Sequence, residues 1–384
     1  MTFPFTPPDH PRFAAHLEQA WATVLARLDA TRLLVGERFP AETCANGHYP
    51  VRDNVEWTTG FWSGQLWLAY QRTGNPAYRA LAERHVISFG QRIVQRIDTA
   101  THDLGFLYTL SCVAAWRVTG SPSARGIALL AAEALLERFS PQAGIIQAWG
   151  DLDDPAQRGR MIIDCNLNLP LLYWASQQTG DGRFATAART HAEQAARYLV
   201  RPDASTFHTF YMDTESGAPR FGNTHQGYAD DSCWARGQAW GILGFMLSWR
   251  YTGDSQHVAL ARRLADYFLP RLPEDGVCHW DLALLGTGAL RDSSAAAIAV
   301  CGLLELAAAL PPAEAGRYHD AACFIMQSLT VDYLSAPDEV GSGLLKHAVY
   351  HLADNKGVDE CCSWGDYFYV EALTRLTQVW QPYW

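Results

Sequence analysis

The sequence predicts an all-α fold, a closed (α/α)6 barrel in which six inner helices alternate with six outer helices. One observation behind this prediction is that six apolar segments of similar layout recur along the 384 residues. The other is that an amphipathic helical pattern accompanies each apolar segment. A helix that is apolar on every side is buried all round, whereas an amphipathic helix buries one face, so the two types should form two layers.

The six apolar segments are the expected inner helices. The first five contain no charged residue, and four of the six end at a Thr-Gly pair. A glycine just past a helix end is the usual left-handed cap, so we expect these four helices to stop there. In chain order the segments are residues 60–70, 105–116, 166–176, 237–249, 294–304 and 365–373.

The amphipathic patterns are the expected outer helices. An open helical solenoid is the alternative architecture, but solenoid repeats have a near-constant period and polar end caps. Here the spacing between apolar segments varies widely and the last segment is still apolar, which favours a closed barrel. No compositional shift or linker divides the chain, so we expect one domain over residues 1–384. The outer helices are expected near residues 10–35, 78–97, 123–139, 185–200, 255–269 and 313–331.

The composition argues against several classes of protein. A formal net charge of −10 without a basic run argues against a nucleic acid or an anionic membrane as partner. No stretch reaches the roughly 18 uncharged apolar residues of a membrane span, and the N-terminus has no secretory signal. Nine cysteines without a C-x-x-C motif predict buried, reduced thiols in a cytoplasmic protein. The 13 histidines are scattered and form no H-E-x-x-H motif, so no metal is expected.

Carboxylates stand shortly before five of the six expected inner helices. Because these helix starts share one rim of the barrel, we expect their side chains to face a common cavity. Helix capping is a sufficient explanation for Asp53, Asp231 and Asp292. Asp164 differs because it follows an apolar run, which favours the neutral form of the carboxyl group and suits a general acid. With Asp103 on the same rim, the pair has the composition of an acid–base glycosidase.

Arg236 is a single cation placed immediately before an apolar helix. A lone cation is costly in such a place unless it meets an anion. A substrate carboxylate would serve, and so would Asp230 or Asp231, and composition alone does not choose between these partners.

The chain holds 14 tryptophans, more than a core needs, and such numbers suggest the stacking surfaces of clefts that bind sugars. For each tryptophan near the rim, packing in the core is the alternative. The candidates for stacking platforms are Trp57, Trp149 and Trp240.

Five segments resemble the unsaturated glucuronyl hydrolases, glycoside hydrolase family 88, in the same order and over roughly residues 50–375. The resemblance implies an (α/α)6 barrel and a cytosolic enzyme that acts after a polysaccharide lyase. It would remove the 4,5-unsaturated uronic acid that lyases leave at the non-reducing end of oligosaccharides. The segments are HDLGFLY (102–108), IIDCNLNLPLLYWA (162–175), THQGYADDSCWARGQAWGILGF (224–245), DSSAAAIAVCGLLEL (292–306) and GVDECCSWGDYFYVEAL (357–373).

The resemblance also implies roles for individual residues. Asp103 and Asp164 match the two aspartates of the family, and His102 belongs to the same matched segment. Other positions match residues that line the family's pocket, including one in the FHTFYMD segment that composition does not single out. These positions are Trp57, Trp149, His208, His225, Gln226, Arg236 and Trp240.

The implied reaction differs from ordinary glycoside hydrolysis because the bond belongs to a vinyl ether. Asp164 would protonate C4, which places positive charge at C5 and the ring oxygen. The same residue would then act as a base toward a water that adds at C5, and the resulting hemiketal would open and release the sugar. Asp103 would keep Asp164 protonated and orient the substrate. No metal or organic cofactor is needed.

One loop departs from the pattern of family members that favour sulfated glycosaminoglycan fragments. Those members carry two serines and a lysine before the GVDE segment. Here residues 351–356 keep only Lys356, a candidate substrate-binding residue, and add Asp354. A carboxylate repels a sulfate, so we expect unsulfated substrates to be preferred.

Three alternatives remain at this point. Unsaturated rhamnogalacturonyl hydrolases share the barrel and the hydration chemistry, but the His102-Asp103 pair together with Asp164 favours the glucuronyl enzymes. A sugar 2-epimerase would use two histidines, for example His225 and His279, and the carboxylates argue against it. A non-enzymatic scaffold would not explain polar and aromatic residues at the helix starts. The sequence leaves open the glycan, its linkage and length, and the oligomeric state.

Overall fold

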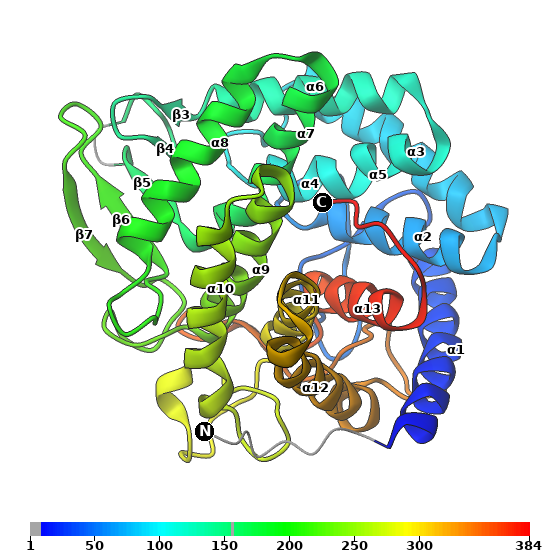
Figure 1. The fold of residues 1–384 in the computed structure, drawn as a ribbon. Coiled ribbons are helices and arrows are strands. Elements are labelled where there is room, and N and C mark those ends of the chain that lie inside the picture. The colour runs from blue at the N-terminus through cyan, green and yellow to red at the C-terminus, as the bar shows by residue number, and fades with distance from the viewer. Residues whose placement is uncertain (1–8, 155–156) are drawn as a thin grey trace.

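The computed structural model describes residues 9–154 and 157–384, and the helices of this part form a closed ring of two alternating layers (Figure 1). The expected barrel is therefore confirmed. The first eight residues, on which the prediction about a secretory signal partly rests, lie outside the described residues. No helix in the described ranges is both long and apolar enough to cross a bilayer.

The inner layer contains the helices expected from the apolar segments, and one of them is interrupted by a π-helical turn. Glycines with φ between 69° and 76° follow four of these helices, at Gly74, Gly120, Gly180 and Gly253, which confirms the predicted left-handed caps. The inner helices are α2 (Thr59–Thr73), α4 (Leu104–Tyr108) continued by η1 (Thr109–Val113) and α5 (Ala114–Thr119), α7 (Leu169–Thr179), α9 (Ala235–Thr252), α11 (Ser293–Ala309) and α13 (Ser363–Thr377).

The outer helices bury one face each, as their amphipathic patterns predict. In the fifth of them, for example, Leu260, Ala261, Leu264 and Phe268 are buried at helical spacing. The outer helices are α1 (His10–Val35), α3 (Pro76–Val94), α6 (Pro122–Leu136), α8 (Gly182–Gln194), α10 (Ser255–Phe268) and α12 (Pro312–Ser328).

Two glycines allow the inner helices to approach one another near their starts. A Cβ atom on Gly60 would lie 2.3 Å from the carbonyl oxygen of Phe106, and one on Gly105 would lie 2.2 Å from the Cα atom of Asn168. Real Cβ atoms essentially never come this close to backbone atoms, so only glycine fits at both positions. The close approach brings the starts of α2, α4 and α7 together at one rim.

Short antiparallel strands occupy the loops between outer and inner helices, and the apolar periodicity did not predict them. The largest sheet has the order β5-β6-β7 and pairs Arg160 with Tyr211 and Tyr211 with Phe221. The pairs are β1 (Phe39–Pro40) with β2 (Val51–Arg52), β3 (Phe139–Ser140) with β4 (Ile145–Ile146), β5 (Arg160–Ile162) with β6 (Thr209–Met212) and β7 (Pro219–Asn223), and β8 (Ala348–His351) with β9 (Lys356–Glu360).

The C-terminal segment folds back against the inner helices, and its end lies inside the ring (Figure 1). The ring of Trp384 is stacked on Phe368 of α13 with 5.9 Å between centroids. Its Nε1–H donates to Glu371 across 2.8 Å, and its edge meets Phe106 of α4. Aromatic side chains from three segments therefore fill the barrel axis below the inner-helix starts.

Candidate active site

A cavity of about 360 Å³ opens at the rim where the inner helices begin. Every predicted site residue except Lys356 lines it. The lining residues are Trp57, His102, Asp103, Trp149, Ile162, Asp164, His208, His225, Gln226, Trp234, Arg236, Trp240, Tyr350, His351 and Asp354.

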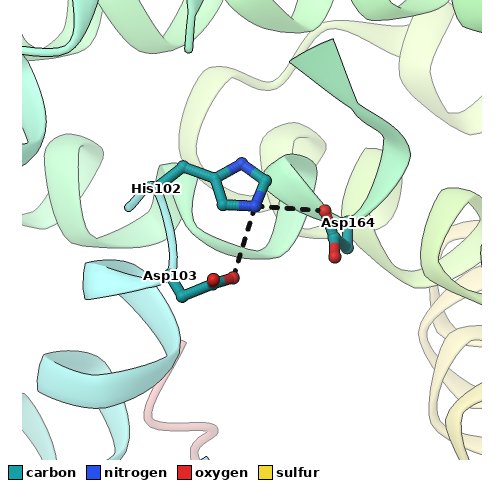
Figure 2. Close-up of side chains that lie close together, drawn as sticks. All are labelled: His102, Asp103 and Asp164. Carbon is teal, nitrogen blue, oxygen red and sulfur yellow. Dashed lines mark ion pairs between the residues drawn. The ribbon is translucent and has the colours of Figure 1, made fainter. Parts of the chain in front are cut away.

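The imidazole of His102 lies between the two predicted catalytic carboxylates (Figure 2). Its Nε2 atom is 3.3 Å from Oδ1 of Asp103 and 3.4 Å from Oδ1 of Asp164. Asp103 stands at the start of α4, and Thr101 donates a hydrogen bond of 2.6 Å to its other oxygen. Asp164 comes from the short helix after β5. Two different inner-helix starts thus supply the carboxylates of one cluster.

The environment of Asp164 favours its neutral form. Burial raises the pKa of Asp164 to about 6, while the neighbouring His102 lowers it and the carboxylate of Asp103 raises it. Among the described residues, Oδ1 of Asp164 has no hydrogen-bond partner. The carboxyl group is therefore poised to exchange a proton with a bound molecule near neutral pH.

His102 is held as an imidazolium. Burial lowers its pKa, but the carboxylates of Asp103 and Asp164 outweigh that effect, and the pKa lies well above the usual 6.5. The ligand atoms of these three residues lie within 4.8 Å of one another, a spacing that a metal ion could use. A metal ion bound there would displace the proton that the imidazole and the two carboxylates share.

Arg236 is buried at the start of α9 and held by groups of neighbouring elements. It donates hydrogen bonds of 2.9 Å to the carbonyl oxygens of Val349 and Tyr350, and its guanidinium lies 3.5 Å from Asp292. Of the partners that the sequence left open for Arg236, the structure pairs it with neither Asp230 nor Asp231. Asp292 fills that place because the starts of adjacent inner helices meet at the rim.

The capping predictions have different outcomes. Asp292 accepts hydrogen bonds from the backbone N–H groups of Ser294 and Ala295 and caps α11, as predicted. Asp53 instead forms an exposed ion pair with Arg38, so it does not cap α2. Asp53 stands too far before the first turn of α2 to accept from its N–H groups.

Aromatic rings form the floor and one side of the cavity. Trp57 donates from Nε1 to the hydroxyl oxygen of Tyr350 across 3.0 Å. Trp240 is almost fully buried and contacts Phe106 and Phe368, so it belongs to the core while one part lines the cavity. Trp149 is 41% exposed and lies at the mouth. Both interpretations of the tryptophans, stacking platform and core packing, therefore apply to Trp240.

His208 is a neutral hydrogen-bonding group. Its Nδ1 atom accepts from the backbone N–H groups of His225 and Gln226, at 2.9 Å and 3.3 Å, which leaves the proton on Nε2. Burial lowers its pKa well below 6.5, and nearby positive groups, including Arg236, lower it further. The ring packs against Trp234 at 4.4 Å. A neutral donor therefore faces the same cavity as the charged cluster.

Sequence reasoning missed Trp234, Tyr350 and His351 as lining residues. Tyr350 and His351 belong to the short strand β8, where no periodic pattern marks them. Trp234 stands directly before α9, inside the segment 224–245 that the family resemblance identifies. Its position two residues before Arg236 could have indicated that it lines the cavity.

Two predicted residues lie elsewhere. Lys356 forms an ion pair of 2.9 Å with Glu42, and its ammonium group lies over the ring of Tyr350. Lys356 therefore contacts a residue of the cavity wall without lining the cavity itself. His279 bonds to the carbonyl oxygen of Ala289 and does not line the cavity, so it forms no catalytic pair with His225.

Comparison with known proteins identifies the family. Residues 36–305 match Glycosyl Hydrolase Family 88. The chain is 46% identical to an unsaturated chondroitin disaccharide hydrolase of Streptococcus pyogenes, covering 91% of this chain and 88% of that protein. It is 47% identical to the unsaturated glucuronyl hydrolase of Bacillus sp. strain GL1, covering 91% and 93%.

Solved structures agree with the sequence comparisons. The unsaturated glucuronyl hydrolase of Streptococcus agalactiae superposes with a TM-score of 0.94 at 44% identity, covering 97% of this chain and 94% of that one. The Bacillus sp. GL1 enzyme superposes with a TM-score of 0.91 at 46% identity, covering 94% and 96%. The chain therefore belongs to glycosyl hydrolase family 88.

Proposed function

We propose that the protein is an unsaturated glucuronyl hydrolase, a glycosidase that removes the 4,5-unsaturated uronic acid from the non-reducing end of lyase-generated oligosaccharides. The observation that carries the proposal is the cluster of Asp103, His102 and Asp164 inside a cavity with an aromatic floor. Relatives support it by name, and two similar solved structures are described with dGlcA-GalNAc6S and with dGlcA-Glc-Rha-Glc.

Asp164 is the proton donor in the proposed mechanism. Its carboxylic acid gives a proton to C4 of the substrate, so the C4=C5 double bond becomes a C4–H bond and positive charge develops at C5 and the ring oxygen. The carboxylate left behind accepts a proton from water as the water oxygen bonds to C5. The proton count of Asp164 is restored, and the hemiketal opens to release the remaining sugar. This route requires no metal or organic cofactor.

The other residues hold the substrate and tune Asp164. Asp103 raises the pKa of Asp164 and is proposed to orient the sugar ring of the substrate. The imidazolium of His102 lies between the two carboxylates. The polar groups of His208, His225 and Gln226 and the charge of Arg236 are proposed to bind the uronic acid. The rings of Trp57 and Trp240 are proposed to stack on it, and Trp149 to stack on the next sugar. Lys356 supports the wall through Tyr350.

The loss of ultraviolet absorbance from the conjugated double bond tests this function. We expect the signal to disappear with unsaturated disaccharides from hyaluronan or unsulfated chondroitin. Loss only with a pectin-derived fragment would establish the rhamnogalacturonyl reaction instead. No loss with any unsaturated substrate would refute the proposed chemistry.

The variant Asp164→Asn tests the assignment of the proton donor. An amide has no proton to give to C4, so we expect turnover to fall by about 10³-fold or more while substrate still binds. The measurement is the absorbance assay together with calorimetric binding. Asp53→Asn is the matched control, because Asp53 is an exposed aspartate paired with Arg38 outside the cavity. Near-normal turnover by Asp164→Asn would contradict the assignment.

We also propose a preference for unsulfated substrates. Asp354 lines the cavity with a largely exposed carboxylate that lies 2.8 Å from Nδ1 of His351, and the charge of Lys356 is offset by Glu42. The negative charge repels a sulfate on the second sugar. We expect the kcat/KM ratio of unsulfated to 6-sulfated chondroitin disaccharide to exceed one, and Asp354→Asn to lower that ratio. Faster turnover of the sulfated disaccharide by the unchanged protein would contradict this preference.

We propose that the enzyme acts in the cytoplasm. All nine cysteines are free and buried, as expected of a protein kept in a reducing compartment.

A further inference from the structure

A row of three side chains crosses the sheet β5-β6-β7 on the face that continues the cavity wall. Arg160 is directly opposite Tyr211, and Tyr211 is directly opposite Phe221, so the three side chains project from the same face. Ile162 stands two residues along β5 from Arg160 and therefore shares this face. Since Ile162 lines the cavity, the row lies one step outward from the cavity wall.

Contacts join the row to the mouth of the cavity. The guanidinium of Arg160 lies 3.6 Å from the ring centroid of Trp149, and its Nε–H donates to the hydroxyl oxygen of Tyr211 across 3.2 Å. The same hydroxyl lies 3.3 Å from Nε2 of His225. Tyr211 is in turn stacked on Phe221, with 4.7 Å between centroids and 26° between planes. Trp149, Arg160, Tyr211 and Phe221 thus form one continuous surface, which we call the outer platform.

The outer platform is buried in its middle and open to solvent at its ends. Arg160 and Tyr211 are buried, whereas Trp149 is 41% exposed and Phe221 is 48% exposed. Within the described residues, Nη1 of Arg160 has no hydrogen-bond partner although the side chain is only 8% exposed. A bound molecule that supplied an acceptor to this N–H group would satisfy it.

Of the outer platform, the proposed reaction uses only Trp149, because the reaction concerns one unsaturated residue and the bond that joins it to the next sugar. An oligosaccharide longer than two residues must continue beyond Trp149. The next surface that it meets is the rest of the outer platform. The apolar face of a pyranose ring packs well on an aromatic ring, and the N–H groups of an arginine suit sugar hydroxyls and uronate carboxylates.

We propose that the outer platform is a binding subsite for the third sugar of longer substrates, with Phe221 as the stacking surface and Arg160 as the hydrogen-bond donor. This inference rests on the proposed function and adds to it the residues that hold the third sugar. The unsaturated residue occupies the cavity, the second sugar lies at Trp149, and the third lies on Phe221.

Kinetics with substrates of two lengths test the subsite. An unsaturated disaccharide and an unsaturated tetrasaccharide prepared from the same unsulfated chondroitin are compared in the absorbance assay. We expect Phe221→Ala to lower kcat/KM for the tetrasaccharide by about three- to tenfold, mainly through KM, because one stacking contact is lost. The disaccharide does not reach Phe221, so its kcat/KM stays unchanged. Phe221→Trp retains the stacking surface and restores the tetrasaccharide value.

The matched control is Leu130→Ala, which removes an exposed apolar side chain from α6 on the outer layer. It should change kcat/KM for neither substrate. An equal loss on both substrates for Phe221→Ala would overturn the subsite and indicate a general structural effect. No loss on the tetrasaccharide would overturn it as well.

A binding measurement separates this inference from the proposed function. Calorimetric titration with the tetrasaccharide compares Asp164→Asn with the double variant Asp164→Asn/Phe221→Ala, so no turnover is involved. A three- to tenfold higher Kd for the double variant supports the subsite. Equal Kd values overturn it even if the unchanged protein consumes both substrates. Failure of the unchanged protein to consume either substrate refutes the proposed function and leaves the titration to decide on the subsite.

Discussion

His102 stands between two aspartates that have the same side chain and different roles. Asp164 is buried beside apolar residues, and its pKa rises to about 6. Asp103 receives a hydrogen bond from Thr101, which stabilises an acceptor rather than a donor. The imidazolium acts on Asp164 with the opposite sign to Asp103, because a nearby cation lowers the pKa of a carboxyl group and a nearby anion raises it.

The pH profile tests this arrangement. In the proposed mechanism the reactive form of Asp164 is the protonated one, so kcat/KM should fall as pH rises through about 6. His102→Asn removes the cation and should move this alkaline limb to higher pH. Asp103→Asn removes the anion and should move it to lower pH. The measurement is kcat/KM with an unsaturated disaccharide from about pH 4 to about pH 8. Shifts of both variants in the same direction would contradict the arrangement.

The sequence contained enough to predict much of the cavity at the residue scale. Asp164 could be singled out because its apolar neighbours in the chain are buried and its own carboxyl group is buried with them. His208 was reached only through the family resemblance. Its function depends on N–H groups of residues 225 and 226, and that contact across the chain leaves no local pattern. Tyr350 was missed for the same reason.

At the scale of single elements, close contacts between inner helices position the two aspartates. Gly105 lies two residues after Asp103 and packs against Asn168, four residues after Asp164. The backbone N–H of Phe106 also donates to the side-chain oxygen of Asn168 across 2.7 Å. The distance between the aspartates therefore depends on how closely α4 approaches the start of α7.

Substitution of this glycine should affect both stability and turnover. Gly105→Ala forces a Cβ against the backbone of Asn168, so we expect a loss of about 1–3 kcal/mol in the free energy of unfolding and a lower kcat. Gly126→Ala in α6 is the matched control, because an added Cβ there has nothing within 4 Å. It should stabilise the protein by about 0.4–1 kcal/mol and leave kcat unchanged. Denaturant unfolding and the absorbance assay check both, and equal effects of the two variants would refute the argument.

The helices could be predicted because twelve long periodic segments specify them, whereas the strands could not. Strands of two to five residues are too short to show an alternating pattern. The segment 105–116 was expected as one helix, and the structure interrupts it with the π-helical turn η1 (Thr109–Val113). The residues of this turn are all buried, like those of a regular inner helix, so the sequence shows no difference that would predict the turn.

At the scale of the whole molecule, a buried network of ions ties three inner helices together. Arg375 of α13 pairs with Glu305 of α11 and with Glu371 on its own helix, and Arg250 of α9 also binds Glu305. The pKa of Glu305 is lowered because, although burial raises it, Arg375 and Arg250 outweigh that effect. The charges are paired, so the cost of burying them is offset.

Breaking this network should destabilise the barrel. Arg375→Leu leaves two buried carboxylates without their main partner, and we expect a loss of about 3–5 kcal/mol in the free energy of unfolding. Because the folded pKa of Glu305 is depressed, this contribution is present above its unfolded pKa and is lost as pH falls below it. The difference in the free energy of unfolding between the unchanged protein and Arg375→Leu should therefore become smaller in acid. Urea unfolding at neutral and acidic pH measures it.

Arg84→Leu is the control for the network, because Arg84 forms an ion pair with Glu37 in which both side chains are more than half exposed. No measurable loss is expected there. A loss for Arg375→Leu no larger than that of this surface pair would show that the network does not stabilise the barrel.

The aromatic filling of the barrel axis has a consequence for the order of events in a catalytic cycle. Below Trp240, the rings of Phe106, Phe368 and Trp384 close the axis, so the bound sugar has a floor beneath it. We therefore expect the shortened saccharide of the proposed reaction to depart first, since it would occupy the mouth. We expect the ring-opened keto acid to depart last, from the depth of the cavity. An enzyme with this order of departure is inhibited competitively by the keto acid, whereas the saccharide rebinds only while the keto acid is still in place.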